Sequence, residues 1–384
     1  MVDHVEPGDG REIATRLASR LEEPLGVFAA PGRVNLIGEH TDYNAGLCLP
    51  IALPHATYTA VARRADDRIT VASAQQDDRF EAALGEVSPG AVDGWAAYVA
   101  GVAWALREAG HELPGMDLVV DGRVPLGSGL SSSAALLCSA ALAMCAAAGV
   151  DPDRRELVTA TMRAESEVAG APTGGLDQTA ALLGEAGQAL LIDFRDHTTR
   201  SVPWRPADAG LELLVVDTRA SHAHSDGGYG SRREECETAA RRLGVASLRE
   251  ADHDDLGRLD DGVLRRRVRH VVTEVARVSA TVDALAGDDW RRVGELFTAS
   301  HASMRDDFEI SCAELDVVVE TALGHGALGA RMTGGGFGGS AIALVPTDRT
   351  EDVAGRVADA FADRGWGAPG LLPAPASPGA RRVG

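Results

Sequence analysis

Aromatic residues are scarce in this chain. Phenylalanine, tryptophan and tyrosine make up 4% of its 384 residues, although hydrophobic residues of all kinds make up 45%. We therefore expect an aliphatic core, rich in alanine, valine and leucine, as in soluble globular proteins. A chain of this length is long enough for about two or three domains and for a sizeable core.

Cysteine is scarce too. The five cysteines are odd in number, widely spaced and free of any CxxC pair: Cys48, Cys138, Cys145, Cys236 and Cys312. This argues against a disulfide framework or a zinc site and fits a reducing compartment. The first residues are acidic and polar, so no signal peptide is expected and a cytoplasmic location is predicted.

Positive charge is in deficit. Lysine and arginine number 37 against 57 aspartates and glutamates, which gives a net charge of −20 with histidine neutral. Such a chain is not expected to bind nucleic acid or an anionic membrane. An anionic substrate would need a local positive site. The acidic composition and the lack of an obvious apolar patch favour a monomer.

One long uncharged run could be mistaken for a membrane span. Residues 131–148 carry no charge, but alanine, serine and cysteine dominate the run and large apolar residues are few. We therefore expect a buried helix at this position.

The spacing of apolar residues indicates helices and strands that do not alternate regularly. Helices are predicted at residues 11–23, 95–109, 131–148, 154–168 and 231–243 and over much of 259–323. Strands are predicted at residues 26–30, 47–53, 56–63, 69–74, 116–120, 189–193 and 211–218 and within 329–346. No internal repeat is visible, so the mixture favours an α+β fold. A polar segment near residue 200 suggests a domain boundary, and the tail from residue 369 either adds an edge strand or stays loose.

The stretch at residues 31–44, PGRVNLIGEHTDYN, is dense in hydrogen-bonding side chains and follows a predicted strand. Such side chains are costly to bury unless a polar partner satisfies them. A small ligand rich in hydroxyls is such a partner, because carboxylates accept from hydroxyls while asparagine and histidine both donate and accept. Gly32 and Gly38 allow close approach of the backbone. The alternative is a solvated loop.

Residues 125–135, PLGSGLSSSAA, form a glycine- and serine-rich loop before the alanine-rich helix. Gly127 and Gly129 allow backbone N–H groups to converge on phosphate oxygens. The serines at positions 131–133 are expected to cap the helix and leave N–H groups facing an anion, and a hydroxyl there can reach Mg²⁺. The loop is neither a Walker loop nor a dinucleotide fingerprint. A serine-rich cap on a buried helix is the alternative.

Two further segments carry unusual residues. Residues 329–340, GARMTGGGFGGS, hold five glycines between positions 334 and 339, which costs more backbone entropy than a connector needs. In GGLDQ, Asp177 alone would most simply be a helix N-cap, and Glu165 alone a solvated helix carboxylate. His222 and His224 are interpreted as polar loop residues rather than as a metal-binding pair.

Together these motifs resemble the signatures of the galactokinase family, within the kinase superfamily that also contains homoserine, mevalonate and phosphomevalonate kinases. GRVNLIGEHTDYN resembles the first signature, PLGSGLSSSAAL the second and GARMTGGGFGGS the third. GGLDQ resembles the setting of the family's catalytic aspartate, with Thr173 and Leu176 where many relatives carry cysteine and methionine. The resemblance implies a two-domain α+β small-molecule kinase, with domains at residues 1–200 and 201–384 and the active site between them.

The resemblance implies transfer of the γ-phosphate of ATP to the C1 hydroxyl of α-D-galactose, the first committed step of galactose catabolism. The implied catalytic residues are Asp177, as proton acceptor or electrostatic group, and Arg33. The implied sugar contacts are Arg33, Glu39, His40, Thr41, Asp42, Gly174, Asp177 and Tyr229. The implied ATP contacts are Trp95, Pro125, Leu126, Gly127, Ser128, Gly129, Leu130, Ser131, Ser132, Ser133, Ala134, Gly335 and Gly336. The implied Mg²⁺ ligands are Ser132, Ser133 and Glu165.

Two alternative functions stay open. A related sugar 1-kinase for N-acetylgalactosamine or arabinose would carry the same motifs, whereas homoserine and mevalonate kinases lack the GEHTDYN segment. A sensor that binds galactose and ATP without turnover belongs to a different functional class. Inactive relatives lose residues from the serine loop, and because residues 131–135 are intact here, the enzyme is favoured.

Overall fold

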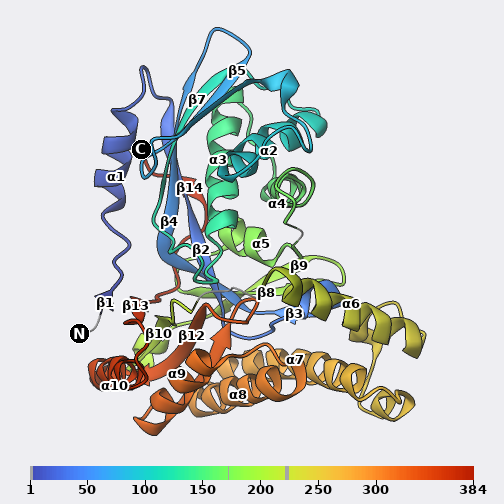
Figure 1. Cartoon of the computed structure of the whole chain (residues 1–384). Helices are drawn as coiled ribbons and strands as arrows, with labels where there is room; N and C mark the ends of the chain where they lie inside the picture. Colours follow the sequence, from blue (N-terminus) through green and yellow to red (C-terminus); the bar gives the residue numbers. More distant parts are fainter. Residues whose placement is uncertain (1–2, 172, 221–224) are drawn as a thin grey trace.

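The computed structural model describes residues 3–171, 173–220 and 225–384 (Figure 1). His222 and His224 lie outside these ranges, so their interpretation as loop residues stays a prediction. Helices and strands are mixed without regular alternation, and the predicted α+β fold class is confirmed.

A six-stranded sheet forms the first body of the molecule. Its strand order is β14-β2-β4-β7-β5-β6, with the bounds Arg381–Arg382, Gly26–Asn35, Pro50–Arg63, Met116–Gly122, Arg68–Ser73 and Arg79–Ala83. Helix α1 (Gly10–Ala18) covers one face. The other face carries α2 (Trp95–Glu108), α3 (Ser132–Ala148), α4 (Arg154–Arg163) and α5 (Leu176–Leu183) (Figure 1). Because side chains alternate along β2, Val27 and Ala29 pack with α1, and Phe28 and Ala30 with the other helices.

Strand β4 continues through a proline. Two separate strands are predicted within residues 47–63, but the structure has a short β3 (Leu47–Cys48) followed by the single long β4. The pairing of β4 with β2 shifts register between Pro31 and Arg33, at the level of Pro54. Proline has no N–H to donate, so it is tolerated where the ladder is already interrupted.

A five-stranded sheet forms the second body, in the order β1-β13-β10-β12-β11. Its strands are Asp3–His4, Gly370–Pro373, Leu211–Asp217, Ser340–Pro346 and Gly329–Thr333. The helices of this body are α6 (Ser225–Leu243), α7 (Gly262–Ala286), α8 (Trp290–Ser303), α9 (Ala313–Gly324) and α10 (Thr350–Asp363) (Figure 1).

A three-stranded sheet lies between the two bodies, formed by β3, β8 (Gln188–Asp193) and β9 (Thr198–Pro203) (Figure 1). One hydrophobic cluster contains Val34 of the first sheet, Leu47 and Val202 of the middle sheet, and Ile342 of the second sheet. The two bodies therefore share a common core, which holds them together around the site described below.

The two ends of the chain each join the sheet of the opposite half. Strand β1 pairs in parallel with β13, and β14 pairs with β2 as an edge strand. The C-terminal tail is thus ordered: its first strand, β13, lies between β1 and β10, and its last strand, β14, is an edge strand. The domain boundary near residue 200 stays a prediction, and the terminal strands cross it in both directions.

Short helical turns complete the fold: Asp42–Asn44, Leu84–Glu86, Ala164–Val168, Pro206–Ala209, Leu248–Glu250, Asp254–Arg258, Met304–Phe308 and Thr347–Arg349. Helix α3 is buried along most of its length, which confirms the buried helix predicted at residues 131–148. Within the described ranges, no helix combines the length and apolarity that crossing a membrane requires.

Candidate active site

A cavity of about 350 Å³ opens where the predicted motifs come together. Its wall combines the region from β2 to residue 42, the starts of α3 and α5, part of α6, and the loop between β11 and β12. The lining residues are Arg33, Asn35, Glu39, His40, Asp42, Gly127, Gly129, Ser131, Ser132, Ser133, Thr173, Gly174, Gly175, Leu176, Asp177, Tyr229, Gly334 and Gly335. Segments that are distant in the sequence therefore share one site.

Arg33 joins the first motif both to Asp177 and to the glycine- and serine-rich loop. Its Nη2 atom lies 2.7 Å from Oδ1 of Asp177, and its Nη1 atom donates to the backbone oxygen of Gly129 at 2.6 Å. The backbone N–H of Arg33 donates to the oxygen of Leu130 at 3.1 Å. Glycine is required at position 32, because a Cβ on Gly32 would lie 2.5 Å from that same oxygen. The structure thus brings the two predicted catalytic residues into contact.

Asp177 lies in the first turn of α5, and the residues before it pack against Asp42. Gly175 precedes the helix with a φ of +90°, a conformation that favours glycine. A Cβ on Gly174 would lie 1.9 Å from Oδ2 of Asp42, so a side chain there would displace the carboxylate. Burial raises the pKa of Asp42 to about 6. The backbone N–H of Tyr43 opposes this rise, and the charge of Asp177 adds to it.

The loop between β7 and α3 brings backbone to the cavity wall. Gly127 and Gly129 have φ angles of +74° and +72°. Ser131, at the N-cap position, has a φ of +63° and makes no capping bond, so the predicted cap at this serine is wrong. A capping side chain accepts from the helix when its own backbone is extended, and that of Ser131 is left-handed. Its buried Oγ has no hydrogen-bond partner in the described part of the chain.

Several predicted residues lie outside the cavity wall. The Thr41 hydroxyl lies 2.9 and 2.7 Å from two backbone oxygens, within hydrogen-bond distance of both. The Ser128 hydroxyl donates to the backbone oxygen of Pro125 at 2.7 Å. Leu126 is 84% exposed, and Gly336 lines an adjoining hollow of about 270 Å³. The others that do not line the cavity are Trp95, Pro125, Leu130, Ala134 and Glu165.

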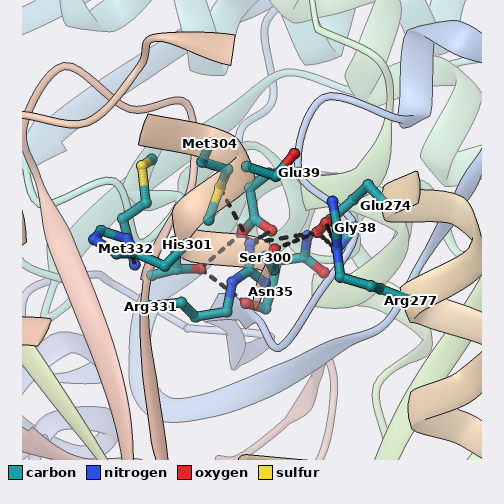
Figure 2. A network of polar contacts seen from close by, with 12 residues as sticks. Asn35, Gly38, Glu39, Glu274, Arg277, Ser300, His301, Met304, Arg331 and Met332 are labelled. Atoms are coloured by element: carbon teal, nitrogen blue, oxygen red, sulfur yellow. Dashed lines mark hydrogen bonds and ion pairs between the residues drawn. The ribbon is translucent and has the colours of Figure 1, made fainter. Parts of the chain in front are cut away.

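Glu39 is held by a buried network of charged groups (Figure 2). The Nη2 atom of Arg331 contacts Oε2 of Glu39 and lies 3.7 Å from Oε1 of Glu274. Oε1 of Glu39 accepts from the Thr333 hydroxyl and the Gly334 N–H, both at 3.1 Å. One arginine is therefore shared between two carboxylates, and burial raises the pKa of Glu39 in spite of Arg331.

Glu274 extends this network to α7 (Figure 2). Its Oε2 atom lies 2.7 Å from Nε of Arg277, and its Oε1 atom accepts from the Ser300 hydroxyl at 2.7 Å and the Gly38 N–H at 2.9 Å. Burial alone would raise the pKa of Glu274, but Arg277 and Arg331 lower it to about 2. The network fastens the first motif to the second body. Nothing in the sequence analysis predicts its members in α7 and α8, and those in β11 belong to the third signature without an assigned role.

His40 bridges two parts of the cavity wall. Its Nδ1 lies 2.8 Å from the Tyr43 hydroxyl and its Nε2 lies 3.1 Å from the backbone oxygen of Gly335. Because a carbonyl oxygen only accepts, Nε2 carries the proton and Nδ1 accepts from the tyrosine. Burial lowers the pKa of His40 to about 3, so the ring is neutral. Its ring centroid lies 5.1 Å from that of Tyr229, which also lines the cavity.

Glu165 lies in a single π-helical turn, Ala164–Val168, that follows α4. It is 3% exposed, so the alternative of a solvated carboxylate is wrong. Its Oε2 accepts from the Gln178 amide, and the Thr173 hydroxyl lies 3.4 Å away. Burial raises the pKa of Glu165 to about 7, and a hydrogen bond from the cavity-lining Ser133 lowers it.

Five cavity-lining residues are absent from the predicted site: Asn35, Thr173, Gly175, Leu176 and Gly334. The last four adjoin predicted residues in the sequence, so their position beside the motifs could have identified them. Asn35 carries a clearer signal, because it is an amide between the apolar residues Val34 and Leu36 at the end of a buried strand.

Three family profiles match the chain. The profile "Galactokinase galactose-binding signature" matches residues 18–63. The profile "GHMP kinases N terminal domain" matches residues 97–185, and the profile "GHMP kinases C terminal" matches residues 281–365.

The chain is similar over nearly its whole length to curated proteins. A galactokinase of Streptomyces coelicolor is 52% identical over 97% of this chain and 100% of its own length. A galactokinase of Mycobacterium tuberculosis is 49% identical over 92% of this chain and 98% of its own length.

Solved structures are similar as well. The crystal structure of Lactococcus lactis galactokinase complexed with galactose superimposes with a TM-score of 0.92 and 31% identity, covering 97% of this chain and 99% of that one. The mevalonate kinase of Methanococcus jannaschii shares the fold, with a TM-score of 0.65 and 15% identity over 93% of this chain and 98% of its own.

Proposed function

The chain belongs to the galactokinase family of ATP-dependent sugar kinases, and from this premise we propose that it phosphorylates galactose at the C1 hydroxyl. The C1 oxygen forms a bond to the γ-phosphorus of ATP, while the bond from that phosphorus to the β–γ bridging oxygen breaks. The products are galactose 1-phosphate and ADP.

Asp177 is the residue to which we assign the proton of the C1 hydroxyl. It lines the cavity, is 21% exposed, and is oriented by its contact with Arg33. Arg33 also contacts the loop that faces the phosphates, through the Gly129 oxygen. A cation with contacts on both sides of the reacting atoms is suited to stabilise charge that develops on the transferring group.

Sugar hydroxyls are assigned to the polar side chains opposite that loop. Asp42, Glu39 and Tyr229 line the cavity and can accept or donate at hydroxyls. His40 contributes its ring to the wall, because both of its nitrogens are used within the protein. Gly174 leaves space for the Asp42 carboxylate.

The phosphates of ATP are assigned to the start of α3 and to Gly127 and Gly129. An uncapped helix N-terminus offers N–H groups and a positive dipole end, which matters in a chain of net charge −20. The oxygen donors at Ser132, Ser133 and Glu165 suit a hard cation such as Mg²⁺, which takes its other ligands from phosphates and water. When bound, Mg²⁺ neutralises phosphate charge.

The observation that carries the proposal is the contact between Arg33 and Asp177 inside a cavity that all three motifs share. An ADP-release assay with galactose, N-acetylgalactosamine, arabinose and mevalonate tests it. We expect turnover with galactose far above that with the other three. Higher turnover with one of the other sugars would transfer the assignment to that sugar. Sugar and ATP binding without ADP release would favour the sensor.

We further propose that the enzyme acts as a monomer in the cytoplasm. The acidic composition and the five cysteines, all of them unpaired, support this proposal. Sedimentation of the purified protein under reducing conditions tests the monomer.

A further inference from the structure

Asn35 is the one fully buried amide on the cavity wall formed by the described residues. Its side chain has no exposed surface, and neither Nδ2 nor Oδ1 has a hydrogen-bond partner among those residues. Buried amides in folded proteins are nearly always paired, because an unpaired donor or acceptor is costly at this depth. An unpaired carboxamide on a ligand cavity therefore indicates a ligand group that would pair with it.

The fold itself does not require an amide at this position. On β4, Asn35 faces Pro50, which has no N–H, and the backbone oxygen of Asn35 lies 2.9 Å from the Thr333 hydroxyl instead. The backbone oxygen of Asn35 thus has a donor besides the side chain, one that it shares with Oε1 of Glu39. The sequence neighbours of Asn35, Val34 and Leu36, are apolar and belong to the common core, but side chains alternate along a strand, so they lie on the face opposite to the amide.

The position of Asn35 points to the sugar side of the cavity. The Thr333 hydroxyl that contacts Asn35 also lies 3.1 Å from Oε1 of Glu39, and Figure 2 shows Asn35 beside this network. Two residues before it on β2, Arg33 holds Asp177. Asn35 is therefore linked through Thr333 to the proposed sugar ligand Glu39, and it lies two residues from Arg33 of the proposed catalytic pair.

The chemistry of the amide selects the partner. A carboxamide offers two N–H donors and one acceptor oxygen, and a hydroxyl, which both donates and accepts, can satisfy both ends. Phosphate oxygens at neutral pH mainly accept, which would leave Oδ1 unpaired. We propose that Asn35 binds a ring hydroxyl of the monosaccharide and contributes to sugar specificity, an inference that rests on the proposed function.

The test replaces Asn35 by leucine, which has a similar size and no polar atoms. Without sugar, Asn35→Leu is expected to melt at or above the wild-type temperature, because it removes two unpaired groups. The KM for galactose is expected to rise by about 10- to 100-fold, while the KM for ATP stays unchanged. The galactose-induced rise in melting temperature should be lost.

Asn44 provides the matched control. It is a buried asparagine of the same motif, but its Nδ2 donates to the backbone oxygen of His40 at 2.8 Å. Asn44→Leu should therefore melt below the wild type. If Asn35→Leu does not fold, Asn35→Ser serves for the same comparison. Asn35 variants that melt lower but keep the wild-type KM for galactose would show a structural amide and overturn the inference.

Deoxygalactoses identify the hydroxyl. The analogue that lacks this hydroxyl should bind the wild type more weakly than galactose does. To the Asn35→Leu variant, the analogue and galactose should bind equally well. Equal losses in both proteins for every analogue would overturn the inference, even with wild-type activity on galactose intact. Wild-type protein that neither binds nor phosphorylates galactose would instead overturn the proposed function, and the inference with it.

Discussion

The Arg33 guanidinium lies 2.7 Å from the Asp177 carboxylate, although the two residues come from different motifs, one at the end of β2 and the other at the start of α5. The side chain of Arg33 is 8% exposed, so the pair is largely shielded from water. A second guanidinium nitrogen bonds the Gly129 oxygen. The geometry therefore links the residue proposed to receive the proton with the loop proposed to hold the phosphates.

Asp177→Asn is expected to lower kcat by at least about 100-fold, since a positioned proton acceptor contributes a factor of this order or more. The shape of the side chain is kept, so ATP should still bind. Steady-state ADP release and ATP titration measure the two effects. Glu167→Gln, at an exposed helix carboxylate paired with Arg163, is the control and should keep wild-type turnover. Near wild-type kcat in Asp177→Asn would contradict the mechanism.

Gly174→Ala is expected to raise the KM for galactose by about 10-fold or more and leave the KM for ATP unchanged. The added Cβ would lie 1.9 Å from Oδ2 of Asp42, so the carboxylate must move, and a small misplacement of a binding group is costly. Gly355→Ala, in α10, is the control, because the φ there is not in the left-handed region and no atom lies within 4 Å of the added Cβ. Equal effects on both KM values would contradict a local role at Asp42.

The motifs could be identified because each is a continuous pattern of residues in the sequence. The residues that hold the motifs in place after folding form no such pattern. Arg33 and Asp177 could be predicted from residues that adjoin them in sequence. The contact of Arg331 with Glu39 could not, since β11 meets the first motif only after folding. Helix α10 was not predicted, and the prediction of a cap at Ser131 was wrong because its left-handed backbone has no sequence signal.

Arg331→Met is expected to reduce the free energy of unfolding by about 3–5 kcal/mol, because removal of one partner leaves a buried charge uncompensated. Glu39 would lose its cation, while Glu274 keeps Arg277. Adding Glu39→Gln to Arg331→Met should restore part of the loss. Urea unfolding of the two variants and the wild type measures this. A single variant as stable as the wild type would show that the network does not support the fold.

Sugar binding should weaken in acid because of Asp42. Burial raises the pKa of this carboxyl from 3.8 to about 6, so below that pH it is protonated and loses acceptor capacity. The affinity for galactose should fall as pH decreases from about 7 to 5. Asp42→Asn should bind galactose more weakly at pH 7 and lose this part of the pH dependence. Calorimetric titration at several pH values measures both effects.

The same shift predicts the opposite trend for the stability of the sugar-free protein. The folded state favours the protonated carboxyl, so this contribution is complete below about pH 4 and is lost as pH rises through about 6. We therefore compare the free energy of unfolding of Asp42→Asn with that of the wild type at two pH values. The variant minus wild-type difference should be more positive at pH 8 than at pH 4. The difference can reach about 3 kcal/mol, because the shift is about two pKa units. A pH-independent difference in urea unfolding would show that Asp42 titrates normally.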